Sequence, residues 1–179
     1  MMQGDDGAGA AGSQLRTRSP EAGDGDRGNR LAQVVLPEHA GSRATTLAQK
    51  NDLQQAITDL QHDSLFALVG HSGPFVLSLS VQGRSLALDV RREDGTPVRA
   101  IGLALGPFRR IIKDYRLLID AYDEALADSN AFRIQAIDMG RRGLHNEGAG
   151  MMIERLAGKV EIDFETARRL FTLVCLLQQ

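Results

Sequence analysis

Hydrophobic residues return at helical spacing in several parts of the chain. Between Thr45 and about Gln61 they recur every three or four positions with polar residues between them, which predicts an amphipathic helix. A longer stripe follows Pro107, which suits the first turn of a helix because its missing N–H loses no hydrogen bond there. The stripe consists of Phe108, Ile111, Ile112, Tyr115, Leu118, Ile119, Tyr122 and Leu126. It predicts a second helix with one buried face.

Two more helices are predicted in the C-terminal part of the chain. One begins near Asn130 and runs into Gly140–Gly150, where the glycines leave open whether it continues without a break. Gly158 predicts the end of a helical segment over Met151–Ala157, and Asp163 predicts the N-cap of the last helix. The expected inward positions of that last helix are Phe164, Ala167, Leu170, Phe171 and Val174.

Three segments alternate large apolar residues with small or polar ones: residues 75–81, 86–90 and 101–105. This alternation is typical of strands with one exposed face. Gln82-Gly83 and Asp94-Gly95 lie between them, and both glycines stand where a tight hairpin requires positive φ. The pattern predicts an antiparallel meander, and the β-prone run over residues 31–36 is expected to add to it as a fourth strand.

The predicted fold is α+β, an antiparallel meander of three to four strands packed on one face by about four amphipathic helices. Residues 1–30 are crowded with Gly, Asp, Arg, Ser and Ala and offer little to a core, so they are interpreted as a disordered tail. Residues 31–179 are then expected to form one domain.

Composition narrows the function classes. The formal net charge is −2, and two Tyr and six Phe are the only aromatic residues, so nucleic-acid binding is disfavoured. The acidic start lacks the features of a secretory signal, and no apolar run approaches the roughly 20 residues that cross a bilayer. The single cysteine, Cys175, lies in an apolar run and excludes an internal disulfide. These features predict a cytoplasmic protein without membrane contact.

Three stretches are distinctive beyond their periodicity: RRIIKDY at 109–115, AIDMGRRGLHNEG at 136–148 and GKVEIDFETARRLF at 158–171. They resemble the bacterial uncharacterised protein family 0262, found chiefly in alphaproteobacteria, over roughly residues 31–177. The family has no established activity, substrate or cofactor. The resemblance therefore implies a small bacterial cytoplasmic protein and supplies no catalytic residue.

The segment Asp138–Gly150, which begins within the second of these stretches, is the main site candidate. If a helix persists through it, Asp138, Arg142 and His145 share one face at i, i+4 and i+7 and are suited to hold an anion. The alternative is an ordinary Asp138–Arg142 ion pair beside a surface histidine. The glycines of this stretch suit either a phosphate-binding loop or a close approach of two helices.

A second group of cations begins the helix after Pro107. Arg109, Arg110 and Lys113 stand in its first turns, where positive charge opposes the helix dipole. This conflict would be relieved by an acidic partner or a phosphate, which we expect Arg141 and Arg142 to share with them.

The leading interpretation is a non-catalytic binding or adaptor domain that recognises an anionic small molecule or an acidic protein surface. The predicted ligand-binding residues are Arg109, Arg110, Lys113, Arg141, Arg142 and Asn146. One alternative is a small enzyme that acts on a phosphorylated or carboxylated metabolite, with His145 as acid/base and Glu147 or Asp138 beside it. Another is a structural homo-oligomer. No cofactor or metal is expected, because the His residues lack partners at metal-ligand spacing.

Overall fold

The structure, a computed structural model, describes residues 28–38, 40 and 46–178. The predicted disordered tail, residues 1–30, lies outside the described residues except for its last three. In chain order the elements are β1 (Leu31–Val35), α2 (Leu47–His62), β2 (Phe66–Leu68), β3 (Phe75–Gln82), β4 (Ser85–Arg91), β5 (Pro97–Ala104), the 3-10 helix η1 (Gly106–Phe108), α3 (Arg109–Ala127), α4 (Ala131–Leu156), β6 (Val160–Ile162) and α5 (Phe164–Leu177).

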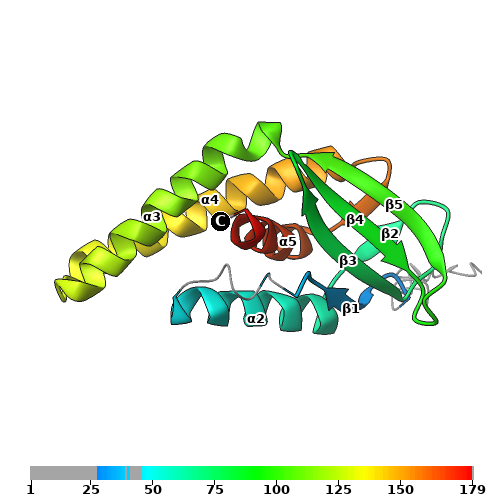
Figure 1. Ribbon diagram of the computed structural model, residues 1–179, viewed down its shortest axis with the longest axis horizontal. Coiled ribbons are helices and arrows are strands. Elements are labelled where there is room, and N and C mark those ends of the chain that lie inside the picture. Colours follow the sequence, from blue (N-terminus) through cyan, green and yellow to red (C-terminus); the bar gives the residue numbers. More distant parts are fainter. Residues whose placement is uncertain (1–27, 39, 41–45, 179) are drawn as a thin grey trace, which may run out of the picture.

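The main sheet has four strands in the order β1-β3-β4-β5. Strands β3, β4 and β5 form the predicted antiparallel meander, and the turn residues Gly83 and Gly95 have φ of 60° and 85°. β1 joins at the edge and runs parallel to β3, so the predicted fourth strand makes the sheet mixed. The helices lie on one side of this sheet, as predicted for the α+β class (Figure 1).

A second, two-stranded sheet pairs β2 with β6 in antiparallel register, with Phe66 opposite Ile162 and Leu68 opposite Val160. The sequence did not predict it, because three residues show too little alternation to be told from a loop. The two short strands join the segment after α2 to the segment before α5. This connection fixes the start of α5, where the Asp163 side chain accepts a hydrogen bond from the Thr166 N–H at 2.7 Å, as the predicted N-cap.

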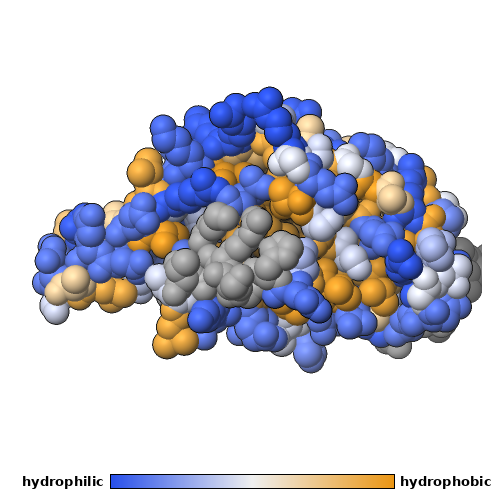
Figure 2. Space-filling view, viewed as in Figure 1, coloured by the Kyte–Doolittle hydropathy of each residue, from blue (hydrophilic) through white to orange (hydrophobic). Residues whose placement is uncertain are grey.

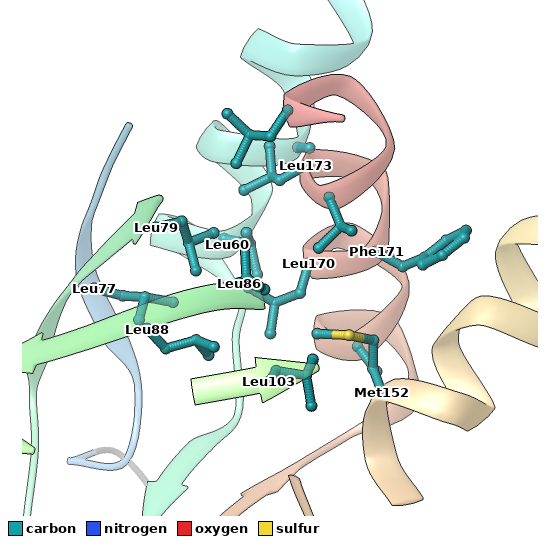
Figure 3. Close-up of a cluster of buried hydrophobic side chains, with 14 of the residues drawn as sticks. Leu60, Leu77, Leu79, Leu86, Leu88, Leu103, Met152, Leu170, Phe171 and Leu173 are labelled. Atoms are coloured by element: carbon teal, nitrogen blue, oxygen red, sulfur yellow. The ribbon is translucent and has the colours of Figure 1, made fainter. Parts of the chain in front are cut away.

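Helix α5 is the centre of the domain, with ten buried residues out of fourteen. It packs against α2 and α4 and faces the sheet (Figure 1). Leucines of β3, β4 and β5 meet Leu170 and Leu173 of α5 and Leu60 of α2 in the core (Figure 3). Phe164 is an exception to the prediction, because the first turn of α5 leaves it 44% exposed.

Helix α4 continues unbroken through all four glycines of the segment that the sequence left open. A Cβ on Gly148 would lie 2.4 Å from a ring carbon of Phe171, so this glycine allows α4 and α5 to approach closely. The interpretation as a phosphate-binding loop is wrong, because the N–H groups inside a helix bond to its own carbonyls.

Helices α3 and α4 form a hairpin that extends beyond the rest of the domain (Figure 1). The outer part of the predicted α3 stripe is therefore less covered, and Leu126 is 49% exposed. No helix among the described residues is both long and apolar enough to cross a membrane.

Candidate functional site

Two cavities concentrate the charged residues that the sequence singled out. The first, of 380 Å³, lies where α2, α4 and α5 meet, and we call it the mixed-charge cleft. Its charged lining residues are Asp52, Asp59, Asp138, Glu165, Arg141, Arg142, Arg168 and Arg169. His145 and Thr172 also line this cavity.

Each arginine of the mixed-charge cleft has an acidic partner. Arg141 joins two helices, with its Nη1 at 2.9 Å from Asp52 Oδ2 and its Nη2 at 3.2 Å from Asp138 Oδ1. Burial raises the pKa of Asp52, and the Arg141 guanidinium opposes that rise. The remaining pairs are Arg142–Asp138 at 3.1 Å, Arg169–Asp59 at 3.2 Å and Arg168–Glu165 at 3.6 Å.

His145 is a buried residue of this cleft, with 9% of its surface exposed, so the alternative of a surface histidine is wrong. Its ring stacks on Tyr115 at 5.4 Å between centroids and meets the edge of Phe171 at 6.0 Å. Burial, with help from Arg141 and Arg168, lowers the pKa of His145 to about 4. The imidazole is therefore neutral at neutral pH.

The second cavity, of 400 Å³, lies between the β3–β4 turn, the start of α3 and the end of α5, and we call it the cationic pocket. Its charged lining residues are Arg84, Arg109, Lys113 and Arg116. The last three are spaced i, i+4 and i+7 and share one face of α3. Hydrophilic residues predominate along this helix (Figure 2).

No carboxylate lines the cationic pocket among the described residues. Nor does any of its four cations form an ion pair within that part of the chain, although seven other arginines do. The pocket therefore has a local excess of positive charge in a chain whose formal net charge is −2.

The structure divides the predicted anion site between the two cavities. Arg141 and Arg142 line the mixed-charge cleft with Asp138 and His145, as the helical spacing predicted, whereas Arg109 and Lys113 line the cationic pocket. Because the two groups of cations line different cavities, the structure does not favour their predicted sharing of one anion.

Three predicted residues lie outside both cavities. Arg110 binds Asp114 within α3 at 3.2 Å and also binds Glu147, and the second contact links α3 to α4. Glu147 is thus engaged away from His145, and Asn146 is exposed without lining either cavity.

Several residues that line the cavities could not be identified, or were not identified, from the sequence. Arg116 was detectable, because it continues the i, i+4 spacing of Arg109 and Lys113 by one more turn. Arg84 had no such signal, since it belongs to a hairpin turn, and Asp52 and Asp59 looked like the polar face of an ordinary helix.

The cysteine thiol and the potential metal ligands are the remaining chemical groups of interest. Cys175 is fully buried, and this burial raises the pKa of its thiol, so the nucleophilic thiolate is disfavoured. Within the part of the chain that the structure describes, no group of three or more His, Cys, Asp or Glu side chains could hold a metal ion.

Fold and cavities together define an α+β domain with two polar sites on its helical side. The chain belongs to the uncharacterised protein family UPF0262, whose profile matches residues 28–179, which confirms the resemblance inferred from the three motifs. It is 53% identical over 159 residues to a UPF0262 protein of Granulibacter bethesdensis, with 84% of this chain and 90% of that protein covered.

Alignments with two other relatives cover similar shares of both chains. A UPF0262 protein of Acidiphilium cryptum is 51% identical over 151 residues, which cover 84% of this chain and 93% of the relative. One from Rhodopseudomonas palustris is 50% identical over 153 residues, which cover 85% and 93%. No solved structure matches the chain.

Proposed function

We propose that this protein is a non-catalytic binding domain that recognises a phosphate- or carboxylate-bearing small molecule in the cationic pocket. One observation carries the proposal: Arg84, Arg109, Lys113 and Arg116 line a single cavity whose described lining contains no carboxylate. Like charges gathered in a concave site repel one another, and an anion between them turns this repulsion into attraction.

The start of α3 supports the same conclusion. Its N-cap, Phe108, offers no side-chain hydrogen bond to the first turn, and the first residues of the helix are cationic. Both features are unfavourable at the positive end of a helix dipole. A bound anion offsets both, because it attracts the guanidinium of Arg109 and the ammonium of Lys113 and is itself favoured at a helix N-terminus.

The residues that line the cationic pocket suit the binding of a ligand better than catalysis. Its volume of 400 Å³ fits a small metabolite, and its described lining contains no His, Cys, Asp or Glu. The alternative of an enzyme that uses His145 concerns the other cavity, where Asp138 lines the same wall but Glu147 is bonded to Arg110.

Isothermal titration calorimetry tests the proposal with two probes, inorganic pyrophosphate and citrate, which separate phosphate from carboxylate recognition. We expect the wild-type protein to bind at least one of them at low salt, and more weakly at about 150 mM salt, where charges are screened beyond about 8 Å. The double variant Arg109→Gln/Lys113→Gln should bind about tenfold more weakly or worse.

Arg155→Gln is the matched control, because Arg155 is exposed in the last turn of α4 and lines neither cavity. It removes one positive charge from the protein without touching the pocket, so its affinity should equal that of the wild type. Absence of binding by both probes at low salt, or equal affinity in the double variant, would overturn the proposal.

A further inference from the structure

Large hydrophobic side chains are exposed on the hairpin of α3 and α4, which projects from the domain (Figure 1). Among the described residues, half of the eight large hydrophobic side chains that are exposed belong to this hairpin: Leu117, Leu126, Phe132 and Met139. Hydrophobic surface is visible near the end of the hairpin, among hydrophilic residues (Figure 2). Exposed apolar side chains that gather in one part of a surface are typical of a contact site for another protein.

On α4 these side chains alternate with small residues along one face. Phe132, Ala136, Met139 and Gly143 are spaced by four, three and four positions, and all of them are exposed. We call these residues the α4 stripe. Residues at this spacing share one side of a helix, and it is the spacing at which two helices pack in a coiled coil.

Gly143 has no structural explanation among the described residues. Glycine inside a helix is less stable than alanine, so its presence needs a reason. Gly148 makes room for α5, and a Cβ on Gly140 would lie 3.4 Å from Leu118, whereas a Cβ on Gly143 would meet no atom within 4 Å. The same is true of Gly150, seven positions further along the same face. A neighbour from outside the chain that approaches the helix backbone explains both glycines.

The α4 stripe is complementary to itself in antiparallel orientation. The pair Phe132 and Gly143 and the pair Ala136 and Met139 have the same midpoint, between residues 137 and 138. A twofold axis at this midpoint sets each large side chain of one copy opposite a small residue of the other. A parallel arrangement would set phenylalanine against phenylalanine and glycine against glycine, so the two helices could not approach evenly.

The charge beside the stripe favours the same orientation. Arg142 and Gln135 are exposed along one edge of the stripe. In the antiparallel arrangement Arg142 of one copy faces Gln135 of the other, and the two Arg142 residues are nine helix positions, or about 13 Å, apart. A parallel arrangement brings these two like charges together, where they repel.

We propose that the α4 stripe is a dimer interface for a second copy of this chain, with the two α4 helices antiparallel. Both copies use the same surface, as a closed twofold dimer requires. The proposal specifies the homo-oligomer that the sequence left as an alternative. No residue of the stripe lines either cavity, so the dimer does not depend on the function proposed for the cationic pocket.

Sedimentation velocity of the full chain at about 1 to 200 μM tests the proposal. We expect a monomer–dimer equilibrium whose upper limit is twice the 19.4 kDa mass of the chain. Phe132→Ala should weaken dimerisation about tenfold or more, whereas Phe164→Ala, which removes an exposed phenylalanine of α5, is the matched control and should dimerise as the wild type does. A wild type that stays monomeric or forms larger species, or a Phe132→Ala variant that dimerises equally well, would overturn the proposal.

Gly143→Gln tests the close approach of the two helices. Glutamine is a better helix former than glycine and meets no obstacle within one copy, so the variant should keep or raise its Tm at concentrations where both proteins are monomeric. In the dimer its side chain would occupy the space of Phe132 of the other copy, so dimerisation should be about tenfold weaker or worse. Unchanged dimerisation would contradict the proposal.

Disulfide cross-linking tests the orientation of the helices, because the single native cysteine, Cys175, is fully buried. Oxidation of a mixture of Gln135→Cys and Arg142→Cys should give mixed dimers, which mass spectrometry identifies. Arg142→Cys alone should cross-link poorly, because about 13 Å separates its two cysteines and a disulfide needs Cα atoms within about 7 Å. Efficient cross-linking of Arg142→Cys to itself without mixed dimers would show a parallel arrangement and would rule out the proposed interface.

Discussion

The mixed-charge cleft and the cationic pocket each contain four cationic side chains besides any histidine, but only the cleft surrounds them with acids. In the cleft, Arg141 is 28% exposed and bridges two helices through Asp52 and Asp138. In the pocket, all four cations are exposed. Charge in the cleft therefore serves the fold, whereas charge in the pocket has no ion-pair partner among the described residues.

This contrast predicts opposite responses to mutation. Substitutions in the cleft should reduce stability, because partly buried groups lose their partners. Substitutions in the cationic pocket should reduce binding and leave stability unchanged or slightly higher, because they remove repulsion between like charges.

The largest effect is expected from Phe171→Ala. Phe171 is fully buried: its ring meets the ring of His145, which lines the cleft, and stacks on Phe108, just before α3, at 6.2 Å between centroids. The substitution should lower the free energy of unfolding by about 3–5 kcal/mol, measured by urea denaturation. Phe164→Ala, at an exposed position of the same helix, is the control and should cost less than about 1 kcal/mol.

The next largest effect concerns the pH dependence of stability. The unfolded chain protonates His145 near pH 6.5, whereas the folded protein keeps it neutral down to about pH 4. Between these values the unfolded state binds more protons, so stability falls as the pH is lowered through this window. The total loss from this residue should be on the order of 3 kcal/mol.

Urea denaturation at several pH values measures this loss, and His145→Phe should flatten the curve between pH 6.5 and 4. The charged groups around His145 are Arg141 of α4 and Arg168 of α5, and both disfavour its protonation. Asp52 acts in the opposite direction at the acidic end, because its raised pKa lets the folded protein take up a proton more readily. An unchanged slope in the variant would mean that His145 is not the residue responsible.

A smaller effect separates two adjacent arginines of the cleft. Arg141→Gln leaves Asp52 and Asp138 without their shared partner, and we expect it to lower the free energy of unfolding by about 1–3 kcal/mol. Arg142→Gln makes the same change in charge one residue later, at a side chain that is 70% exposed, and should cost less than about 1 kcal/mol. Equal losses in urea denaturation would contradict the distinction between partly buried and exposed pairs.

Local patterns explain why much of the fold was predictable. The α3 stripe, the turn glycines Gly83 and Gly95 and the cap Asp163 each depend on residues close in sequence, and the structure confirms them. The sharing of one face by Asp138, Arg142 and His145 depended only on helical geometry, and their common cavity agrees with it. Helical geometry could also have predicted Arg116, because it shares one helix face with Arg109 and Lys113.

What could not be predicted depends on how distant elements pack. The burial of His145 results from Tyr115 on α3 and Phe171 on α5, neither of which is near it in sequence. The division of the arginines between two cavities arises because α4 and α5 place Arg141 opposite α2, while the β3–β4 turn brings Arg84 to the start of α3. No periodicity encodes these placements.

The smallest expected effect has the opposite sign from all the others. Arg109→Gln/Lys113→Gln removes two cations that oppose the dipole of α3 and repel Arg84 and Arg116, so the ligand-free variant should be more stable than the wild type by roughly 0.3–1 kcal/mol at low salt. The difference should nearly vanish at about 1 M salt, where the screening length is about 3 Å. Addition of pyrophosphate or citrate, whichever binds, should reverse the order, because ligand at about 100 times its Kd stabilises the wild type by about 2.7 kcal/mol and the variant far less. If the ligand-free variant were instead clearly less stable than the wild type, these side chains would contribute to folding, and the contrast between the two cavities would not hold.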